Sequence, residues 1–406
     1  MSTRAKQPRW EVADVIRRFG EAFRAQGRVC KHHLRTLSAL ERCRTAALGG
    51  HIDACTECGA VRISYNSCRN RHCPKCGGLQ RELWIQARSE ELLPVKYYHV
   101  VFTIPEQFNE WCLYNPAFCY DTLFKAAWQT LRTFAADDKW LGAQAGATMV
   151  LHTWGQNLSL HPHIHCIVPG GGLAPQGQWQ NPKRAGSRGF LFPVKAMSKV
   201  FRAIYLRHFT DAYKQGSLHI PPRQKKPFAQ WRCERFAQHW VVYAKAPFHG
   251  PQAVVEYLGR YTHKVAVSNH RITNIDKQRV SFRYKDYRQD GKRKTMSLEG
   301  AEFLRRFCLH ILPPGFRRMR HYGILSNFHK ARALHAARIA LKVEPAQPTQ
   351  KPEAAEQREK VLEQWLGRNP HDCTHCGAKG TIQRVAIIPA ACRDPPPAAM
   401  QSAKFL

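Results

Sequence analysis

The segment LSLHPHIHCIVPGGG, residues 158–172, constrains the fold of this chain more than any other stretch. Histidines occupy every second position from His161 to His165, and such alternation places side chains on one face of a β-strand. Pro162 cannot donate a hydrogen bond to a neighbouring strand, so we expect the strand to begin near it, with His161 at its margin. His163 and His165 are then the pair within the strand. Two imidazoles about 7 Å apart on one face can bind a metal ion or a phosphate.

Strands and helices alternate on either side of this segment. Residues 96–104 are β-branched and aromatic and end before Pro105, which is typical of a buried strand. The order strand, helix, hairpin, helix, strand, helix predicts an α+β fold in which helices pack on one face of a sheet. The predicted hairpin comprises 147–156 and 161–169, helices are expected at 11–26, 32–44, 79–93, 116–136, 192–215, 251–264 and 298–312, and strands at 239–247 and between 265 and 297.

Charge narrows the class of partner. The chain has 406 residues, with 63 Lys and Arg against 29 Asp and Glu, which gives a formal net charge of +34. Such an excess destabilises a compact fold by self-repulsion unless a polyanion neutralises it. Nucleic acid is the expected polyanion, because each neutralised phosphate releases counterions. An anionic membrane surface is disfavoured, since the basic residues are spread through segments with the patterns of folded elements.

Apolar runs and cysteines indicate the compartment. No stretch approaches the ~18 apolar residues of a membrane span, and the first residues, MSTRAKQPRW, lack a secretory apolar core. We therefore expect a cytoplasmic protein without membrane contact, in which disulfides are rare. Clustered members of the 15 cysteines should then be metal ligands. The isolated ones are expected to be small buried hydrophobic residues: Cys112, Cys119, Cys233 and Cys308.

Two cysteine pairs near the N-terminus predict a zinc site. Cys55 and Cys58 form one CxxC, and Cys73 and Cys76 form another after a spacer typical of zinc ribbons. Each CxxC makes a tight turn, or knuckle, that directs two thiolates to one point, so two knuckles complete a tetrahedron. A closed four-thiolate site leaves no position for substrate. We therefore predict one structural Zn²⁺ bound by these four residues.

Further residues around these pairs could bind a second zinc or contact DNA. Other potential ligands are Cys68, His51, His72, Cys43 and Cys30, but their spacing selects no set among them. Arg69, Arg71 and Lys75 could present positive charge to phosphates, and binding of a DNA end competes with a purely structural role for this module. Near the C-terminus a single CxxC, Cys373 and Cys376, could bind metal with His371, His375 and Cys392, and the sequence leaves this open.

The predicted hairpin suggests a third ligand for the histidine pair. Gln156 precedes the hairpin turn and His163 follows it, so antiparallel pairing could return Gln156 beside the histidine face. Two imidazoles and one amide oxygen with open positions suit Mg²⁺ or Mn²⁺ bridged to a phosphate. Taken alone, however, a histidine pair on a strand is more often structural than catalytic.

Two tyrosines share one face of a predicted helix. Tyr257 and Tyr261 are four residues apart, so both phenols project from one face of a helix. With Val254 and Leu258 they also match an apolar core stripe, which is the alternative interpretation. Gly259 costs about 1 kcal/mol inside a helix, but it would let a backbone approach between the two phenols. Three nearby cationic residues also argue against a buried stripe: Arg260, His263 and Lys264.

Three separated motifs carry a resemblance to a known family. TWGQNLSLHPHIHCIVPGGG, YLGRYTHKVAVSN and NSCRNRHCPKC resemble two-tyrosine HUH transposases of insertion-sequence family ninety-one, which are rolling-circle transposases. The resemblance extends from about Gly49 to Tyr322. The histidine–hydrophobic–histidine motif corresponds to His163 and His165, with Ile164 between them. The paired nucleophiles correspond to Tyr257 and Tyr261, and the family's zinc-binding domain corresponds to the cysteine cluster.

The resemblance implies a fold and a reaction. The fold is an HUH endonuclease-type antiparallel sheet with helices packed on it, preceded by a small zinc-binding module. A metal held by the histidine pair polarises the scissile phosphate of single-stranded DNA, and a tyrosine attacks to form a 5′-phosphotyrosine bond. HUH nucleases with Glu or Gln before the motif support Gln156 as third ligand, and we expect Lys264 to assist ionisation of the phenol. We expect four regions: a basic helical segment at 1–45, the zinc-binding domain at 46–93, the catalytic domain at 94–330, and a basic helix with a largely flexible tail and a lone CxxC at 331–406. The flexible tail is predicted from composition, because the chain beyond Lys342 is rich in Pro, Ala, Glu and Gln, and the surroundings of Cys373 are the exception.

The implied partners are single-stranded transposon ends and target DNA in a bacterial, nucleoid-associated setting. The phosphate-binding motif GxxxxGK[ST] is absent, so strand separation is expected from a host helicase, the replication machinery or supercoiling. Two other classes fit parts of the sequence. HPHIHCI also matches a histidine-triad nucleotide hydrolase, in which His163 would be the nucleophile and no metal would be needed. Charge and cysteines alone would also allow a zinc-containing DNA-binding regulator without catalysis.

Overall fold

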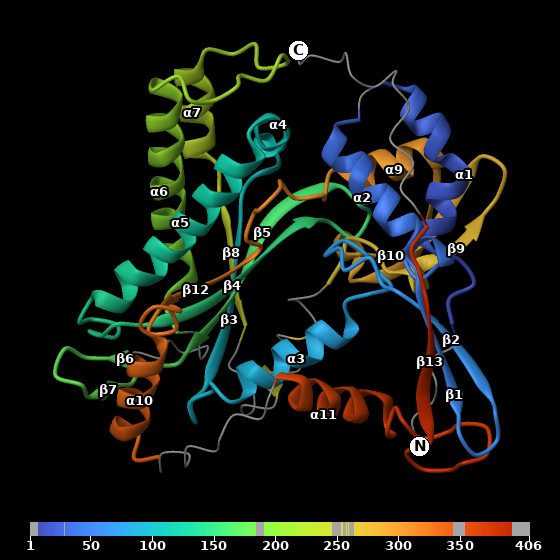
Figure 1. Cartoon of the computed structure of the whole chain (residues 1–406). Coiled ribbons are helices and arrows are strands. Elements are labelled where there is room, and N and C mark those ends of the chain that lie inside the picture. The colour runs from blue at the N-terminus through green and yellow to red at the C-terminus, as the bar shows by residue number, and fades with distance from the viewer. Residues whose placement is uncertain are drawn as a thin grey trace.

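A five-stranded antiparallel sheet lies at the centre of the computed structural model (Figure 1). Its strand order is β12-β4-β5-β3-β8. The strands are β3 (Tyr97–Thr103), β4 (Gly146–Trp154), β5 (Leu160–Pro169), β8 (Val241–Lys245) and β12 (Met319–Gly323). The structure describes residues 7–27, 29–183, 191–245, 253–254, 257, 259, 264–343 and 354–391.

The antiparallel α+β prediction is confirmed, and the period of two in the histidine segment has the expected effect. On β5, Ile164 and Cys166 point into the main core, whereas the histidines occupy the other face. The strand begins at Leu160 rather than near Pro162, so His161 lies inside it but remains exposed. The two faces of the sheet therefore differ sharply in polarity, as alternation requires.

Helices cover the apolar face. The long helices α5 (Pro116–Ala136) and α6 (Val194–Lys214) pack together along one side of the sheet (Figure 1). Aromatic side chains of the shorter helices α4 (Asn109–Tyr114) and α7 (Phe228–Ala237) extend this core. Fully burying one such side chain contributes roughly 1.5–3 kcal/mol, so this face is the main source of stability for the sheet. Among the isolated cysteines, Cys112, Cys119 and Cys308 are buried as predicted, but Cys233 on α7 is exposed.

A second core forms beside the sheet. It joins α1 (Val12–Ala25) and α2 (Lys31–Glu41) to α9 (Gly300–Cys308) and to a sheet of order β11-β10-β9. These strands are β9 (Ile272–Ile275), β10 (Arg279–Asp286) and β11 (Lys292–Glu299). A Cβ at Gly300 would lie 2.1 Å from the Phe19 ring, so only glycine allows α1 and α9 to approach this closely. Residues of the N-terminal segment thus share one core with residues from 266 to 311.

A small sheet joins the two ends of the chain. Its order is β13-β1-β2, formed by β1 (Gly50–Cys55), β2 (Val61–Tyr65) and β13 (Ile382–Ile388). The helix α11 (Ala354–Leu366) lies along α3 (Gly78–Ser89) in the lower part of Figure 1. A largely flexible tail was the expectation from composition, and it is wrong for residues 354–391, because pairing with β1 and packing on α3 give this segment partners that its own composition does not reveal.

The remaining described elements are short. They are the helix α10 (Lys330–Ala340), the strands β6 (Gly172–Leu173) and β7 (Trp179–Gln180), and the 3₁₀ turns η1 (Ala46–Leu48), η2 (Glu106–Phe108), η3 (Asn269–Arg271) and η4 (Tyr287–Gln289). Of the helix predicted at 251–264, the structure describes Val254, Tyr257, Gly259 and Lys264, and Tyr261 lies outside the described residues. No helix among the described ranges is long and apolar enough to cross a bilayer.

Candidate functional site

Three histidines meet on the polar face of the central sheet. The β4–β5 register places His152 opposite His163 and Val150 opposite His165. The imidazole nitrogens of His152, His163 and His165, here called the three-histidine site, all lie within 4.8 Å of one another. This separation allows all three nitrogens to bind one metal ion. The histidine pair was expected from the sequence, and its third member was not.

His152 takes the place that the hairpin argument gave to Gln156. Strand β4 ends at Trp154, so Gln156 lies in the turn and has no partner position on β5. Its backbone carbonyl accepts a hydrogen bond from Arg271, which ties the turn to the second core. The prediction extended the first strand of the hairpin to Gln156, beyond its observed end at Trp154, and so it aligned the wrong residue of that strand with the histidines. The register therefore removes the geometric reason for choosing Gln156 as a ligand.

Hydrogen bonds orient the imidazoles. The Nδ1–H of His163 donates to the carbonyl oxygen of His161 at 2.7 Å, which leaves the Nε2 lone pair for a metal. Nδ1 of His165 lies 2.8 Å from Nε2 of His99, so its other nitrogen is likewise directed away from this contact. Burial lowers the pKa of His163 to about 4 and that of His165 well below its usual value. Both rings are thus neutral at pH 7, the form that binds metal.

A tyrosine reaches this face through a fourth histidine. The hydroxyl of Tyr257 lies 2.9 Å from Nδ1 of His99, and Nε2 of His99 contacts His165. His99 is buried on β3, and burial lowers its pKa to about 3. His99 was not predicted from the sequence. The only local signal was a polar residue within the apolar segment 96–104, and nothing in that segment shows which face it shares.

Tyr257 has both an apolar and a polar environment. Its half-buried ring packs against the buried side chains of Tyr97, Ile167 and Val254. Its hydroxyl instead points to His99. The core-stripe interpretation therefore describes the ring, and the nucleophile interpretation describes the oxygen. Of the other predicted nucleophile, Tyr261, the described residues give no position.

Positive charge borders the site. The pKa of Lys264 is lowered, first by burial and then by repulsion from Arg271 and Lys285. The charge of Lys264 in turn contributes to the lowered pKa of His163 and His165. Lys264 therefore lies close enough to influence the three-histidine site, and Arg271 and Lys285 lie close enough to influence Lys264. Such a group of cations suits the phosphates of a nucleic acid strand.

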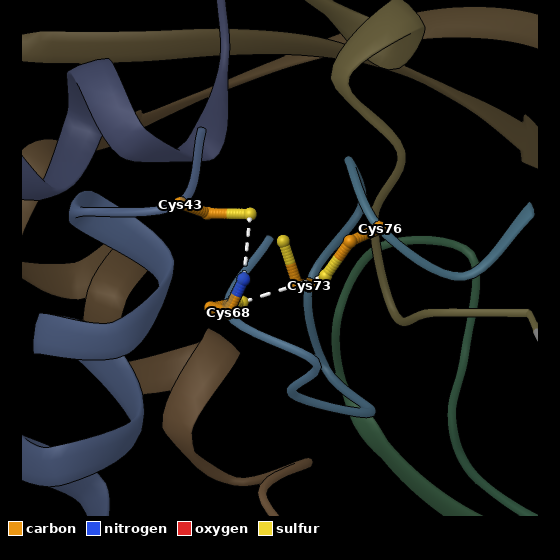
Figure 2. Close-up of side chains that lie close together, drawn as sticks. All are labelled: Cys43, Cys68, Cys73 and Cys76. Atoms are coloured by element: carbon orange, nitrogen blue, oxygen red, sulfur yellow. Dashed lines mark hydrogen bonds between the residues drawn. The ribbon is translucent and has the colours of Figure 1, made fainter. Parts of the chain in front are cut away.

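The predicted zinc site is divided in two. Cys73 and Cys76 lie with Cys43 and Cys68 in one group, called the inner cysteine site, in which all four sulfurs are within 4.8 Å (Figure 2). The backbone N–H of Cys68 donates to Sγ of Cys43 at 3.4 Å, and Sγ of Cys68 is 3.5 Å from Sγ of Cys76. A compact four-sulfur group suits tetrahedral Zn²⁺. Cys68, a possible ligand of a second zinc in the prediction, is therefore placed with one knuckle.

The other knuckle pairs with the C-terminus. Cys55 and Cys58 lie with Cys373 and Cys376, again with all four sulfurs within 4.8 Å, and we call this group the outer cysteine site. The prediction that one tetrahedron joins Cys55 and Cys58 to the second knuckle is wrong, because the β1–β2 hairpin carries the two N-terminal knuckles apart. The C-terminal CxxC is accordingly not a lone pair.

The remaining residues proposed from the sequence have other surroundings. Arg71 donates to the carbonyl oxygen of Pro313 at 2.9 Å and also to those of Leu312 and Phe316, so these N–H groups join the zinc module to the loop before β12 rather than reaching outward. His72 lies outside both cysteine groups, and its buried Nε2 has no hydrogen-bond partner among the described residues. Arg69 has a φ of +52°. Its side chain is exposed, which a contact to DNA would require.

Other potential ligands also lie outside the two groups. His51 on β1 approaches Asp53 at 3.5 Å, and His371 approaches Glu359 at 2.7 Å. Cys30 is exposed at the start of α2. The backbone N–H of His375 donates to Sγ of Cys373 in the outer site, at 3.4 Å. Cys392 lies outside the described residues.

The combination of zinc-type cysteine groups, a histidine face and strong positive charge defines a DNA-processing protein, and comparison with known proteins identifies its family. A family model described as "Transposase zinc-binding domain" matches residues 15–104, and one described as "Putative transposase" matches residues 146–332. The chain is 45% identical over 373 residues to "Putative transposase y4qJ" of Sinorhizobium fredii, covering 90% of this chain and 92% of that protein. It is 29% identical over 356 residues to the transposase for insertion sequence element IS801 of Pseudomonas savastanoi pv. phaseolicola, covering 85% and 82%.

The chain belongs to the IS91 family of transposases with an N-terminal zinc-binding domain. Transposases cut DNA, so this chain is a DNA-acting enzyme and DNA is its partner. Such a family gives no support to the non-catalytic regulator or to the histidine-triad nucleotide hydrolase. No solved structure matches this chain.

Proposed function

We propose that this transposase cleaves single-stranded DNA on the histidine face, with Tyr257 as nucleophile and a divalent metal ion held by the three-histidine site. The observation that carries the proposal is the line of contacts from the Tyr257 hydroxyl through His99 to His165. It brings a hydroxyl from one segment and metal ligands from another to one face of one sheet. Covalent strand cleavage requires that convergence.

The ligand set bears on which metal would bind. The prediction of Mg²⁺ or Mn²⁺ assumed an amide oxygen as third ligand, whereas the register supplies a third imidazole. Mg²⁺ prefers oxygen ligands, and imidazole favours transition ions, so three neutral imidazoles favour Mn²⁺ over Mg²⁺. A bound divalent ion would polarise a phosphate oxygen and stabilise the negative charge that develops there.

The proposed step is a displacement at phosphorus. The Oη atom of Tyr257 forms a bond to phosphorus, the bond from phosphorus to the 3′ oxygen breaks, the phenol loses its proton, and the departing 3′ oxygen gains one. The hydrogen bond of Tyr257 to His99 holds the attacking oxygen in place before the step. The resulting 5′-phosphotyrosine keeps a phosphodiester bond, so rejoining needs no nucleotide cofactor.

Positive charge near the site would assist the nucleophile. A free tyrosine has a pKa near 10, so only about one phenol in a thousand is ionised at pH 7. The cations that border the site, Lys264, Arg271 and Lys285, favour both a phenolate and the phosphates of a bound strand. We assign to Lys264 the largest share, because its charge acts directly on the histidines.

The proposed biological substrate is the pair of single-stranded transposon ends and the target strand. Tyr261, as second nucleophile, would cut one strand while Tyr257 holds the other end. Strand separation would come from a host helicase or from replication, in the cytoplasm and at the nucleoid, because the chain lacks a phosphate-binding GxxxxGK[ST] motif.

Trapping the covalent product tests this function. The purified chain is incubated with Mn²⁺ and a 3′-labelled single strand carrying the end of its own element, and the products are separated under denaturing conditions. We expect label on the protein, and mass spectrometry should locate it on Tyr257 or Tyr261. Changing both tyrosines to Phe should abolish the adduct, whereas Tyr114→Phe, an exposed tyrosine on α4, should leave it unchanged. An adduct that persists without both tyrosines would refute the assignment.

A further inference from the structure

The outer cysteine site joins segments that no assigned domain brings together. Cys55 is the last residue of β1 and Cys58 follows it, whereas Cys373 and Cys376 precede β13. The two family models match residues 15–104 and 146–332, so the C-terminal pair belongs to neither. Contacts between the pairs span 315 and 321 residues of sequence.

The sulfur positions have the spacing of a metal site. Sγ of Cys55 lies 3.8 Å from Sγ of Cys376, and Sγ of Cys58 lies 3.7 Å from Sγ of Cys373. A Zn–S distance of about 2.3 Å in a tetrahedron places sulfurs roughly 3.8 Å apart. Disulfide sulfurs would be separated by only about 2.05 Å. The four thiols therefore surround a point at the distance of Zn²⁺ ligands.

The two turns have the same backbone pattern. The N–H of Gly59 donates to the carbonyl of Cys55 at 3.0 Å, and the N–H of Gly377 donates to that of Cys373 at 3.1 Å. Both glycines have positive φ, +67° and +81°, which residues with a Cβ rarely adopt. Each turn thus directs its two thiols to one side, as a zinc knuckle does.

The strands around the site fix this pairing. β13 runs antiparallel to β1, with Cys55 opposite Ile382 and Gly50 opposite Ile388. The N–H of Thr56 donates to the carbonyl of Thr381 at 3.0 Å, beside the sulfurs. Because both strands lead directly into the knuckles, the ligands are brought together by ordinary sheet pairing, without strain in either turn.

We propose that Cys55, Cys58, Cys373 and Cys376 bind one Zn²⁺, which links the C-terminal segment to the N-terminal module. Four thiolates close the coordination sphere, so this ion is structural and takes no substrate. The proposal does not rest on the proposed DNA cleavage. Together with the inner cysteine site, it gives this chain two zinc ions.

The linked segment supports the helix beside the tyrosine. Trp365 of α11 lies over Gly78 of α3, where a Cβ would lie 2.8 Å from its ring. Further along α3, Trp84 packs against the same buried cluster as Tyr257, and a Cβ at Gly259 would lie 2.3 Å from Ile85. The outer zinc therefore keeps α11 packed on α3, a contact that we call the brace. Helix α3 in turn packs beside the segment that carries Tyr257.

Metal counting tests the proposal. We expect two zinc ions per purified wild-type chain by plasma mass spectrometry, and one in Cys58→Ser, in Cys373→Ser and in the variant with both changes. If substitutions near opposite ends of the chain each remove one zinc ion, and the double variant loses no more, the two residues bind the same ion. Additive loss, or retention of both ions in either single variant, would overturn the proposal. Cys233→Ser, which changes another exposed cysteine, should retain two ions.

Cysteine labelling gives a test that needs no folded variant. Cys58 and Cys376 are exposed, so they should react rapidly with iodoacetamide unless a metal holds them. In the wild-type chain we expect both to be protected and to become reactive together when a chelator removes zinc. Rapid labelling of either residue before chelation would contradict a bound ion.

Hydrogen–deuterium exchange tests the brace. Loss of the outer zinc through Cys373→Ser should increase exchange in α11 and in α3 at least several-fold, with no change in α5, which lies on the far face of the central sheet. Unchanged exchange in α3 would overturn the brace while leaving the metal site intact.

Discussion

The three-histidine site and the two cysteine sites are built over very different distances along the chain. All three histidines belong to one β4–β5 hairpin. The inner cysteine site combines the end of α2 with two later turns, and the outer site combines the two ends of the chain. The geometry of a site on one hairpin depends on residues that are close in sequence, whereas the geometry of a site made of distant turns depends on the whole fold. The two kinds of site should therefore respond differently to substitution.

The largest expected effect is on the inner cysteine site. Cys73→Ser should destabilise the chain by at least about 5 kcal/mol, since binding of structural zinc contributes on the order of 10 kcal/mol and Cys43 and Cys73 are part of the second core. Cys376→Ser, at the outer site, should cost much less, because that residue is exposed. Urea unfolding followed by fluorescence measures both. If the two variants lose the same free energy of unfolding, the inner and outer cysteine sites do not differ in their contribution to stability.

The next largest effect separates the third histidine from the glutamine. His152→Ala should reduce the rate of covalent adduct formation about 1000-fold, or roughly 4 kcal/mol in activation free energy. Gln156→Ala should change it less than about threefold. Single-turnover kinetics with a labelled strand measures both rates. The reverse order would restore the hairpin argument and displace His152 from the site.

A smaller effect is expected at His99. His99→Gln should lower the adduct rate about 10- to 100-fold, the usual effect of removing a group that orients a metal ligand. Because His99 acts by positioning Tyr257 and His165, Mn²⁺ affinity should weaken in parallel. Isothermal titration with Mn²⁺ measures this second readout. A slower rate at unchanged affinity would limit its role to the tyrosine.

The smallest expected effect concerns a histidine on the same face outside the three-histidine site. Burial lowers the pKa of His321 to about 4, and its ring contacts the Thr148 hydroxyl at 3.0 Å. The unfolded chain then binds more protons below its pKa of about 6.5, so stability falls as pH decreases from 7.5 to 5.5, by about 1 kcal/mol for this residue. His321→Gln should reduce that pH dependence by the same amount in urea unfolding. An unchanged slope would show that His321 has the same pKa in the folded and the unfolded chain.

Local patterns predicted the parts of the sites that local geometry determines. Alternation placed His163 and His165 on one face, and the CxxC spacing identified Cys73 and Cys76 as one knuckle. Gln156 was expected beside the histidine pair, but His152 lies there, because a shift of the turn by a few residues changes which side chain of β4 faces β5. His99 was missed for a related reason, since the pairing register of a separate strand decides which of its side chains lie on the histidine face.

The errors over longer distances have another cause. Cys55 and Cys58 were assigned to the nearest second knuckle in the sequence, yet their partners lie at Cys373 and Cys376. Composition made the segment that carries those partners look flexible, although α11 and β13 are held by α3 and β1. A segment that is stabilised by other elements need not show that stability in its own residues.

The sequence by itself determined the strand that carries the histidine pair, the cysteine knuckles, the excess of positive charge, and the family resemblance. Those features follow from backbone periodicity, turn geometry and charge, which act between near neighbours. Only the tertiary structure decided which knuckles lie together, which residue lies beside the histidine pair, and where the Tyr257 hydroxyl points. Those outcomes depend on strand register and on packing summed over the whole chain, and no short stretch of residues encodes them.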